Sequence, residues 1–140
     1  MKEEIKTFIK LVATYRTNIN QIDRLQERYD YLFYQLENVK GISFEAKATS
    51  TNLLDAEIRK HELRDKLEII ENKIKMLKMI NEYIDKVLQQ IDEDIRCAIV
   101  EIYCYEKTYE EIARKLNYSK AGLYFKIVDA IEQALEKALF

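Results

Sequence analysis

The sequence predicts an all-α protein in which a long two-helix hairpin or coiled coil is followed by a compact module of three helices. Three observations support this fold class. The 140 residues include no proline and only two glycines, the residues that helix interiors tolerate worst. Apolar residues recur every three or four positions over two long stretches. Helix caps and turn residues divide the last third of the chain into short segments.

Composition limits the classes of protein that the chain can represent. Apolar residues make up 48% and charged residues 34%, which provides a core and excludes a disordered chain. The net charge of −2 excludes a polybasic nucleic-acid binder, so any DNA contact must come from a local patch. No apolar run approaches the roughly 18 residues of a membrane span, and no signal peptide is visible at Met1–Glu4. We therefore expect a cytoplasmic protein without membrane contact.

Cysteine and histidine are too sparse to predict a reactive or metal-binding site. Cys97 and Cys104 lie two helical turns apart on one face, too far apart to bridge, and are expected to be small core residues. His61, the single histidine, stands among charged residues and is expected on the surface. These ligands do not make a zinc site, and two glycines cannot build a phosphate loop. We predict no catalytic residue, metal or cofactor, and an enzyme is the least expected class.

The first long helix is predicted from about Lys2 to Val39. Its apolar residues follow at steps of three and four, which places them on one stripe. The stripe comprises Ile5, Phe8, Val12, Tyr15, Ile19, Ile22, Leu25, Tyr29, Leu32, Leu36 and Val39. Two consecutive steps of three around Ile22 predict a local bend or overwinding of this seam. Late in the helix, a core margin or a protein-binding face is indicated by Tyr29, Tyr31, Phe33 and Tyr34.

Residues Lys40 to Asn52 interrupt the pattern. Gly41–Phe44 is expected to stop the first helix, and Thr49–Asn52 offers several N-caps for the next. The second long helix is predicted from about Leu53 to Gln90. Its seam comprises Leu63, Leu67, Ile70, Ile74, Leu77, Asn81, Ile84, Leu88 and Ile91.

Asn81 lies on an otherwise apolar seam. A buried asparagine there costs stability and can fix the register or the partner of the helix. Alternatively, Ile80 takes the inward position and Asn81 lies at the edge. The two long helices either pair as an antiparallel hairpin within the chain or dimerise with another copy.

The third part of the chain divides into three short helices. Asp92 is expected to cap a helix that ends near Tyr105. Thr108, followed three residues later by Glu111, forms a capping box for a helix over Tyr109–Leu116. Ser119 then caps a last helix that runs to about residue 139.

The connection between the last two helices predicts a helix-turn-helix. Ala113 stands where two helices approach closely, and Asn117 occupies a turn that favours a left-handed backbone. Tyr118 is expected to plug the core behind the turn. Leu123 and Ile127 then anchor the last helix, which leaves the residues just after its start exposed for the major groove.

The stretch Tyr109–Ser119, followed by Leu123 and Ala130, resembles region four of bacterial sigma factors. More narrowly, the chain resembles the small sigma-like regulators of phages and prophages of low-GC Gram-positive bacteria, of the ArpU/RinA type. Those proteins carry a helical part ahead of a C-terminal region-four-like module. Val39–Phe44 resembles their central segment, and the likeness is strongest from about Ile91 to Leu139.

The resemblance implies a DNA-binding transcription regulator of phage or prophage genes. Residues 1–90 would form the long helical hairpin or coiled coil for dimerisation or partner binding, and residues 91–140 the region-four-like helix-turn-helix. The partners implied are double-stranded promoter or operator DNA and RNA polymerase. By position, the bases would be contacted by Lys120, Ala121, Tyr124 and Phe125. The residues near phosphates would be Thr108 and Arg114.

The reading positions depart from the family pattern, which usually has Arg, Glu, Lys or Gln there. Ala121 cannot read a base edge by hydrogen bonding, and Phe125 can make only apolar contact, for example with a thymine methyl. Gly122 also weakens the last helix by about 1 kcal/mol relative to alanine.

Charge is unevenly distributed over the last third of the chain. From Asp92 to Phe140 there are ten acidic and seven basic residues, which argues against nonspecific DNA binding. The window Arg114–Val128, however, contains no acid and four cations: Arg114, Lys115, Lys120 and Lys126. So small a patch predicts modest, salt-sensitive affinity, and a homodimer through the long helices would double it and could read two half-sites.

Two other functions remain open from the sequence. The chain can be a helical protein-interaction module, an inhibitor or adaptor, in which the helix-turn-helix is a scaffold. The acidic balance and the weak reading residues favour this interpretation. It can also be a DNA binder similar to a terminase small subunit, although the recognition module of those proteins is usually at the other end of the chain.

Overall fold

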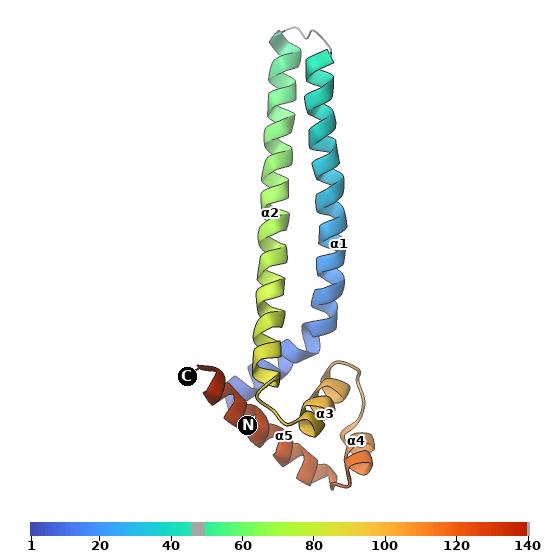
Figure 1. Cartoon of the computed structure of the whole chain (residues 1–140), viewed down its shortest axis with the longest axis vertical. Helices are drawn as coiled ribbons and strands as arrows, with labels where there is room; N and C mark the ends of the chain where they lie inside the picture. The colour runs from blue at the N-terminus through green and yellow to red at the C-terminus, as the bar shows by residue number, and fades with distance from the viewer. Residues whose placement is uncertain (46–49, 140) are drawn as a thin grey trace. The chain divides into compact units, whose positions relative to one another are not determined.

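The computed structural model describes residues 1–45 and 50–139 and consists, over these ranges, of five α-helices without a strand (Figure 1). The helices are α1 (Glu3–Glu45), α2 (Ser50–Leu88), α3 (Glu93–Tyr103), α4 (Tyr109–Leu116) and α5 (Lys120–Leu139). The all-α fold class is confirmed, as is the order of two long helices before three short ones. No helix in the described ranges is both long and apolar enough to cross a membrane.

Both long helices extend into the predicted interruption. Helix α1 continues through Gly41–Phe44 to Glu45, so the predicted helix stop is wrong. One glycine costs an established helix only about 1 kcal/mol, and no proline follows it to block the next hydrogen bond. Helix α2 begins at Ser50, within the predicted group of caps, whereas Thr49 lies outside the described residues.

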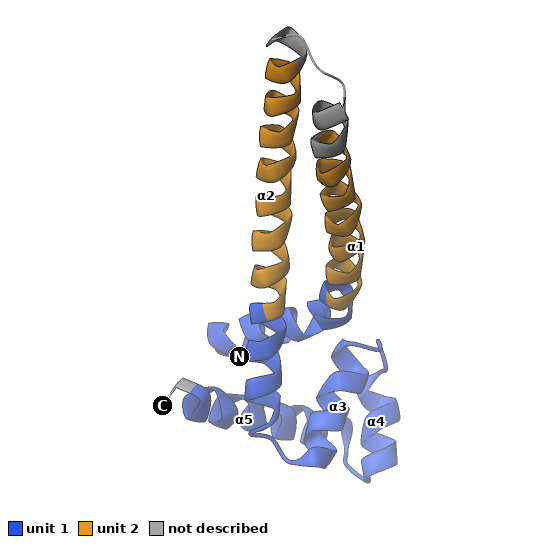
Figure 2. Cartoon of the chain, turned by 45° about the horizontal axis from the view of Figure 1, so that its top comes forward, with its two compact units in different colours: residues 1–18, 79–140 blue, residues 19–78 orange. Residues whose placement is uncertain are grey.

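The chain divides into two compact units that do not coincide with the predicted division after residue 90 (Figure 2). Unit 1 comprises Met1–Asn18 and Met79–Phe140, and unit 2 comprises Ile19–Lys78. The first turns of α1 and the last turns of α2 therefore belong with the three short helices. The apolar pattern alone did not indicate this, because the same three-and-four spacing continues through both long helices.

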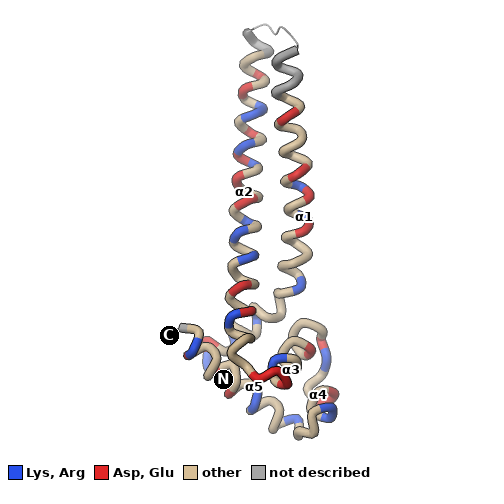
Figure 3. Tube along the Cα trace, viewed as in Figure 1, with Lys and Arg blue, Asp and Glu red and all other residues tan. Residues whose placement is uncertain are grey.

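Unit 2 is an antiparallel pairing of α1 with α2. Its core is formed by apolar residues of both predicted seams: Leu32, Leu36, Val39, Leu63, Leu67, Ile70 and Ile74. Of the two open alternatives, the hairpin is therefore present in this unit. Acidic and basic residues are interspersed along both helices (Figure 3). His61 is exposed, as predicted, and its Nε2 lies 3.8 Å from a carboxylate oxygen of Asp65. Tyr29 packs against the core, whereas its neighbours Tyr31, Phe33 and Tyr34 are exposed.

Unit 1 has one core to which all five helices contribute. Its largest fully buried side chains are Ile5, Phe8 and Val12 of α1, Ile84 and Val87 of α2, Ile99 of α3, and Leu123, Ile127 and Ile131 of α5. Helix α4 adds Ile112 and Ala113. The helix-turn-helix is thus held against residues more than a hundred positions earlier in the chain.

A pair of buried asparagines joins α1 to α2 within unit 1. Asn81 occupies the inward position and accepts a 2.9 Å hydrogen bond from Asn18 Nδ2 on its Oδ1. Its own amide donates to the backbone oxygen of Tyr15. The prediction that Ile19 lies on the apolar stripe is wrong, because Ile19 is 43% exposed and Asn18 takes its place. A polar residue can hold that position because its partner on α2 satisfies its amide.

Helix α3 differs from the prediction in three details. It ends at Tyr103 rather than Tyr105, and Asp92 stands at its N-cap without a capping hydrogen bond from the side chain. Cys97 is exposed, so its assignment to the core is wrong: the buried stripe of α3 is Ile95, Ala98, Ile99 and Ile102. Cys104 is half-buried, and its thiol donates to the backbone oxygen of Val12. Burial raises the pKa of Cys104, which keeps this thiol protonated and unreactive at neutral pH.

Candidate nucleic-acid interface

The first helix of the helix-turn-helix begins at a working N-cap. Thr108 has an extended backbone, and its Oγ1 accepts a 3.1 Å hydrogen bond from the backbone N–H of Glu111. Helix α4 then covers Tyr109–Leu116, as predicted. Thr108 is exposed at the positive end of the α4 dipole, which attracts a phosphate, whereas Glu110 and Glu111 in the same turn oppose one.

The turn after α4 has the predicted left-handed residue. Asn117 has φ 63° and ψ 35°, and the backbone N–H of Tyr118 donates to the oxygen of Ala113 over 2.8 Å. Ala113 is buried, in agreement with a close helix approach. Tyr118 does not plug the core: it is 37% exposed, and its ring centroid lies 5.7 Å from Lys126 Nζ. Fully buried Leu123 supplies the apolar packing expected of it.

The start of α5 explains why a glycine stands in its first turn. Ser119 Oγ accepts a 3.0 Å hydrogen bond from the backbone N–H of Gly122, which confirms Ser119 as the cap. A Cβ atom at Gly122 would lie 2.8 Å from this oxygen. The glycine that costs helix propensity therefore leaves room for the capping hydroxyl.

We predict that Gly122→Ala leaves the free energy of unfolding within about 0.5 kcal/mol of the wild type. The alanine gains about 1 kcal/mol of helix propensity, but it displaces a cap worth about 1 kcal/mol. In a Ser119→Ala background the same change is expected to stabilise by about 1 kcal/mol, since no cap is left to lose. Urea unfolding of the four proteins measures this coupling. Equal stabilisation in both backgrounds would show that the added Cβ and the cap do not conflict.

Three of the four predicted base-contacting residues are exposed on α5. Lys120, Ala121 and Phe125 face solvent, and Phe125 is 68% exposed. Tyr124 differs, because it is half-buried with its ring centroid 5.9 Å from that of Tyr109. Its ring also packs edge-on against Phe125. Tyr124 therefore supports the exposed face rather than projecting from it.

A cluster of three tyrosines fixes the start of α4 against its neighbours. Tyr103 of α3 and Tyr109 of α4 share a hydrogen bond between their hydroxyl groups, and Tyr124 of α5 packs on Tyr109. Burial raises the pKa of Tyr103 and Tyr109 above the usual tyrosine value. Both hydroxyls therefore stay protonated at neutral pH, and the cluster does not supply negative charge near the exposed face.

The basic window is free of acids in sequence but not in space. Lys115 Nζ lies 3.3 Å from a carboxylate oxygen of Glu101, and Lys120 Nζ lies 3.6 Å from one of Glu110. Lys126 lies over the Tyr118 ring. In the described part of the chain, no ion pair forms with exposed Arg114. These exposed pairs are worth little in themselves, but each must be given up before the lysine can bind a phosphate.

Sequence reasoning missed three lysines at the start of α1, of which Lys2 contacts α5. Lys2 of α1 forms an ion pair with Glu132 of α5, which raises the pKa of Lys2. Glu132 stands two turns after Phe125 and therefore on the same face of α5. Lys6 and Lys10 follow Lys2 at steps of four, on the side of α1 opposite its buried stripe. That spacing is the signal by which the sequence alone could have indicated them.

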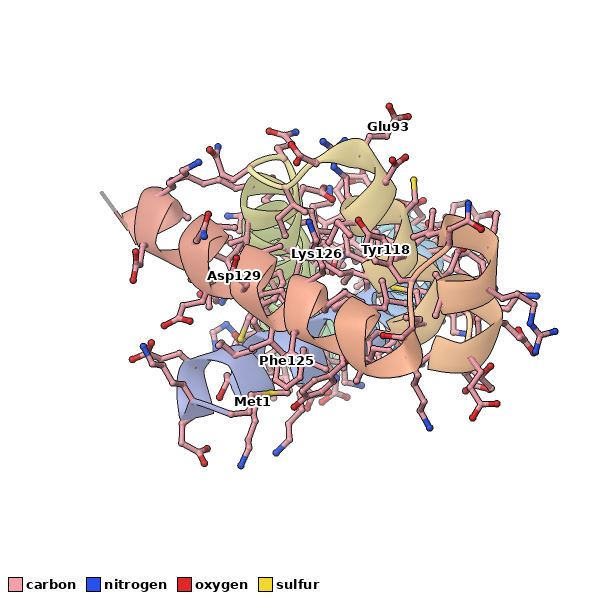
Figure 4. All side chains as sticks on the ribbon, turned by 90° about the horizontal axis from the view of Figure 1, so that it is seen from below. Met1, Glu93, Tyr118, Phe125, Lys126 and Asp129 are labelled. Atoms are coloured by element: carbon pink, nitrogen blue, oxygen red, sulfur yellow. The ribbon has the colours of Figure 1, made fainter. Side chains whose placement is uncertain are left out.

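Acidic residues limit the basic surface on α5. Asp129 stands one turn after Phe125, and Glu132 follows it. Figure 4 shows Lys126 together with Tyr118 on one side of α5 and Phe125 on the other. Phosphate binding is therefore favoured toward the start of α5 and disfavoured along the rest of the helix, where Glu132 is paired with Lys2.

The described residues do not include a cluster of three or more His, Cys, Asp or Glu side chains that could hold a metal ion. The arrangement of caps, turn and exposed helix start is that of a helix-turn-helix with an apolar centre and cationic edges. A comparison of the chain with protein-family models, curated proteins and solved structures found no match.

Proposed function

We propose that the chain is a transcription regulator of phage or prophage genes that binds promoter or operator DNA through α4 and α5 in the cytoplasm. One observation carries the proposal: α4 and α5 are capped by Thr108 and Ser119, turned at left-handed Asn117, and leave the start of α5 exposed. This is the geometry with which a recognition helix enters a major groove. The resemblance to region four adds RNA polymerase as a second proposed partner.

Affinity is expected to be modest and strongly dependent on salt. Arg114 and Lys126 are exposed and form no ion pair with the described residues, whereas Lys115 and Lys120 must exchange a carboxylate for a phosphate. Lys2 and Lys6 of α1 are likewise paired, with Glu132 and Glu3, and would have to give up these carboxylates before binding a phosphate. Each phosphate neutralised contributes about 0.9 to the slope of log K against log salt concentration.

We propose further that the protein acts as a homodimer. The seam of unit 2 is already occupied within the chain, so a second copy would need another surface. Exposed apolar residues on α2 support one: Ile58 is 49%, Ile69 67% and Met76 57% exposed. Two copies would double the cations facing DNA and could read two half-sites.

The proposal can be tested with the full chain and a pool of random duplexes. Duplexes retained at low salt are sequenced, and their dissociation constants are measured by fluorescence anisotropy. Lys120→Glu combined with Lys126→Glu is expected to raise Kd by about tenfold or more, because two phosphate contacts become repulsive. The matched control is Lys66→Glu with Lys73→Glu on α2 of unit 2, which makes the same change in charge and should leave Kd nearly unchanged.

Two outcomes would count against the proposal. If the double reversal on α5 leaves Kd unchanged, α5 is not the recognition helix. If no duplex is retained at low salt, the protein-interaction module becomes the better interpretation. That second candidate is favoured by the ion pairs of Lys115 and Lys120 with carboxylates. It is also favoured by the exposed rings of Tyr31 and Tyr34. A terminase small subunit-like role would share the DNA binding but leave transcription of the bound gene unchanged.

A further inference from the structure

The exposed face of α5 has an apolar centre. Ala121 and Phe125 are four residues apart, so they lie one above the other on the same side of the helix. Phe125 is 68% exposed, far more than a ring that belongs to the core. Tyr124, the adjacent aromatic residue, is drawn into contact with Tyr109 and does not shield Phe125 from solvent above this face.

The polar groups near this face lie at its edges. Lys120 pairs with Glu110 of α4 on one side, and Lys126 lies over the Tyr118 ring on another. Neither Ala121 nor Phe125 carries a hydrogen-bond donor or acceptor in its side chain. Asp129 and Glu132 follow Phe125 on this face. A duplex placed against the start of α5 would therefore meet Lys120 and Lys126 at the level of its phosphates and an apolar surface at the level of its base edges.

We propose that α5 recognises thymine bases by apolar contact of Phe125 and Ala121 with their C5-methyl groups; this inference rests on the proposed DNA binding. The thymine methyl is the one apolar group that base pairs of unmodified DNA display in the major groove, and alanine and phenylalanine are side chains that contact it. Four residues span about 6 Å along a helix. Bases follow at about 3.4 Å along a strand. The two contacts thus fit thymines about two steps apart.

The test replaces each thymine of a selected duplex by uracil, which removes only the methyl group. Anisotropy with the full chain is expected to show one or two positions at which Kd rises about fourfold, the effect of losing one buried methyl. Conversely, a cytosine at such a position should bind more weakly than thymine, and 5-methylcytosine should recover part of the loss.

Phe125→Ala identifies the side chain responsible. In this variant the difference between thymine and uracil is expected to disappear at one position and to persist elsewhere. The change removes an exposed ring, so the fold should be retained, which circular dichroism can verify. Phe33→Ala on α1 of unit 2, which removes a 47% exposed ring, is the matched control and should preserve the full difference.

The outcomes separate this inference from the proposed function. A duplex that binds equally well with uracil at every position would overturn the methyl contact and leave DNA binding intact. Unchanged discrimination in Phe125→Ala would overturn the role of that residue. If Phe125→Ala instead lowers the mass measured by light scattering without affecting discrimination, the ring contacts a second copy and the inference is wrong. Failure to retain any duplex would overturn the proposed function itself.

Discussion

Ile127→Ala is expected to lower the free energy of unfolding by about 3 kcal/mol. Ile127 is fully buried in the core of unit 1, where α5 meets the other helices. The substitution removes apolar atoms from the core and leaves a cavity that rigid neighbours fill only in part. Urea unfolding followed by far-ultraviolet circular dichroism measures the loss. The proposed DNA binding should weaken in parallel, since α5 depends on this contact for its position.

The matched control is Ile19→Ala, the same chemical change at a residue that is 43% exposed and lies outside the surface proposed for the homodimer. It should alter the free energy of unfolding by less than about 1 kcal/mol. Equal losses in the two variants would contradict the difference in burial between Ile19 and Ile127. A small loss in Ile127→Ala would contradict the placement of α5 in this core.

Asn81→Leu is expected to lower the free energy of unfolding by about 2 kcal/mol. The Nδ2 group of Asn18 would lose its 2.9 Å acceptor and retain only a longer bond to Thr14 Oγ1. The backbone oxygen of Tyr15 would lose its bond from the Asn81 amide. Thermal and urea unfolding can both detect a change of this size.

The double variant Asn18→Leu with Asn81→Leu is expected to regain most of this loss, because replacing both partners leaves no buried amide without a partner. Asn72→Leu, at an exposed position of α2, serves as the control and should have little effect. If the double variant is destabilised by the sum of its two single changes, the asparagines do not interact as a pair.

Much of the fold could be predicted because helix periodicity and caps are local signals. Thr108, Asn117 and Ser119 carry their structural roles in their own chemistry, and all three were assigned correctly. Asn18 could not be assigned from α1 alone, because its burial depends on Asn81, which is 63 positions away. The stop at Gly41–Phe44 was misjudged, since the cost of one glycine is smaller than that of ending a long helix.

The candidate site was predictable in position but not in its electrostatics. Lys120 and Phe125 follow from the spacing after the turn. The pairing of Lys115 with Glu101 joins residues on different helices, so a window of sequence free of acids did not imply a surface free of them. Tyr118 is more exposed, and Tyr124 more buried, than the sequence predicts. A tyrosine ring can lie in a core or on a surface, and only its neighbours in the fold decide which.

Unit 1 is closed by two segments of the chain with all of unit 2 between them. During synthesis, Met1–Asn18 leaves the ribosome long before the residues that will cover Ile5 and Phe8. All residues of unit 2 have been synthesised before α5 begins, so its hairpin can fold while α5 is still being made. The surface that we propose to bind DNA therefore forms last. Adding or removing whole heptads in the hairpin would change the number of residues between the two segments of unit 1 without altering any residue of unit 1.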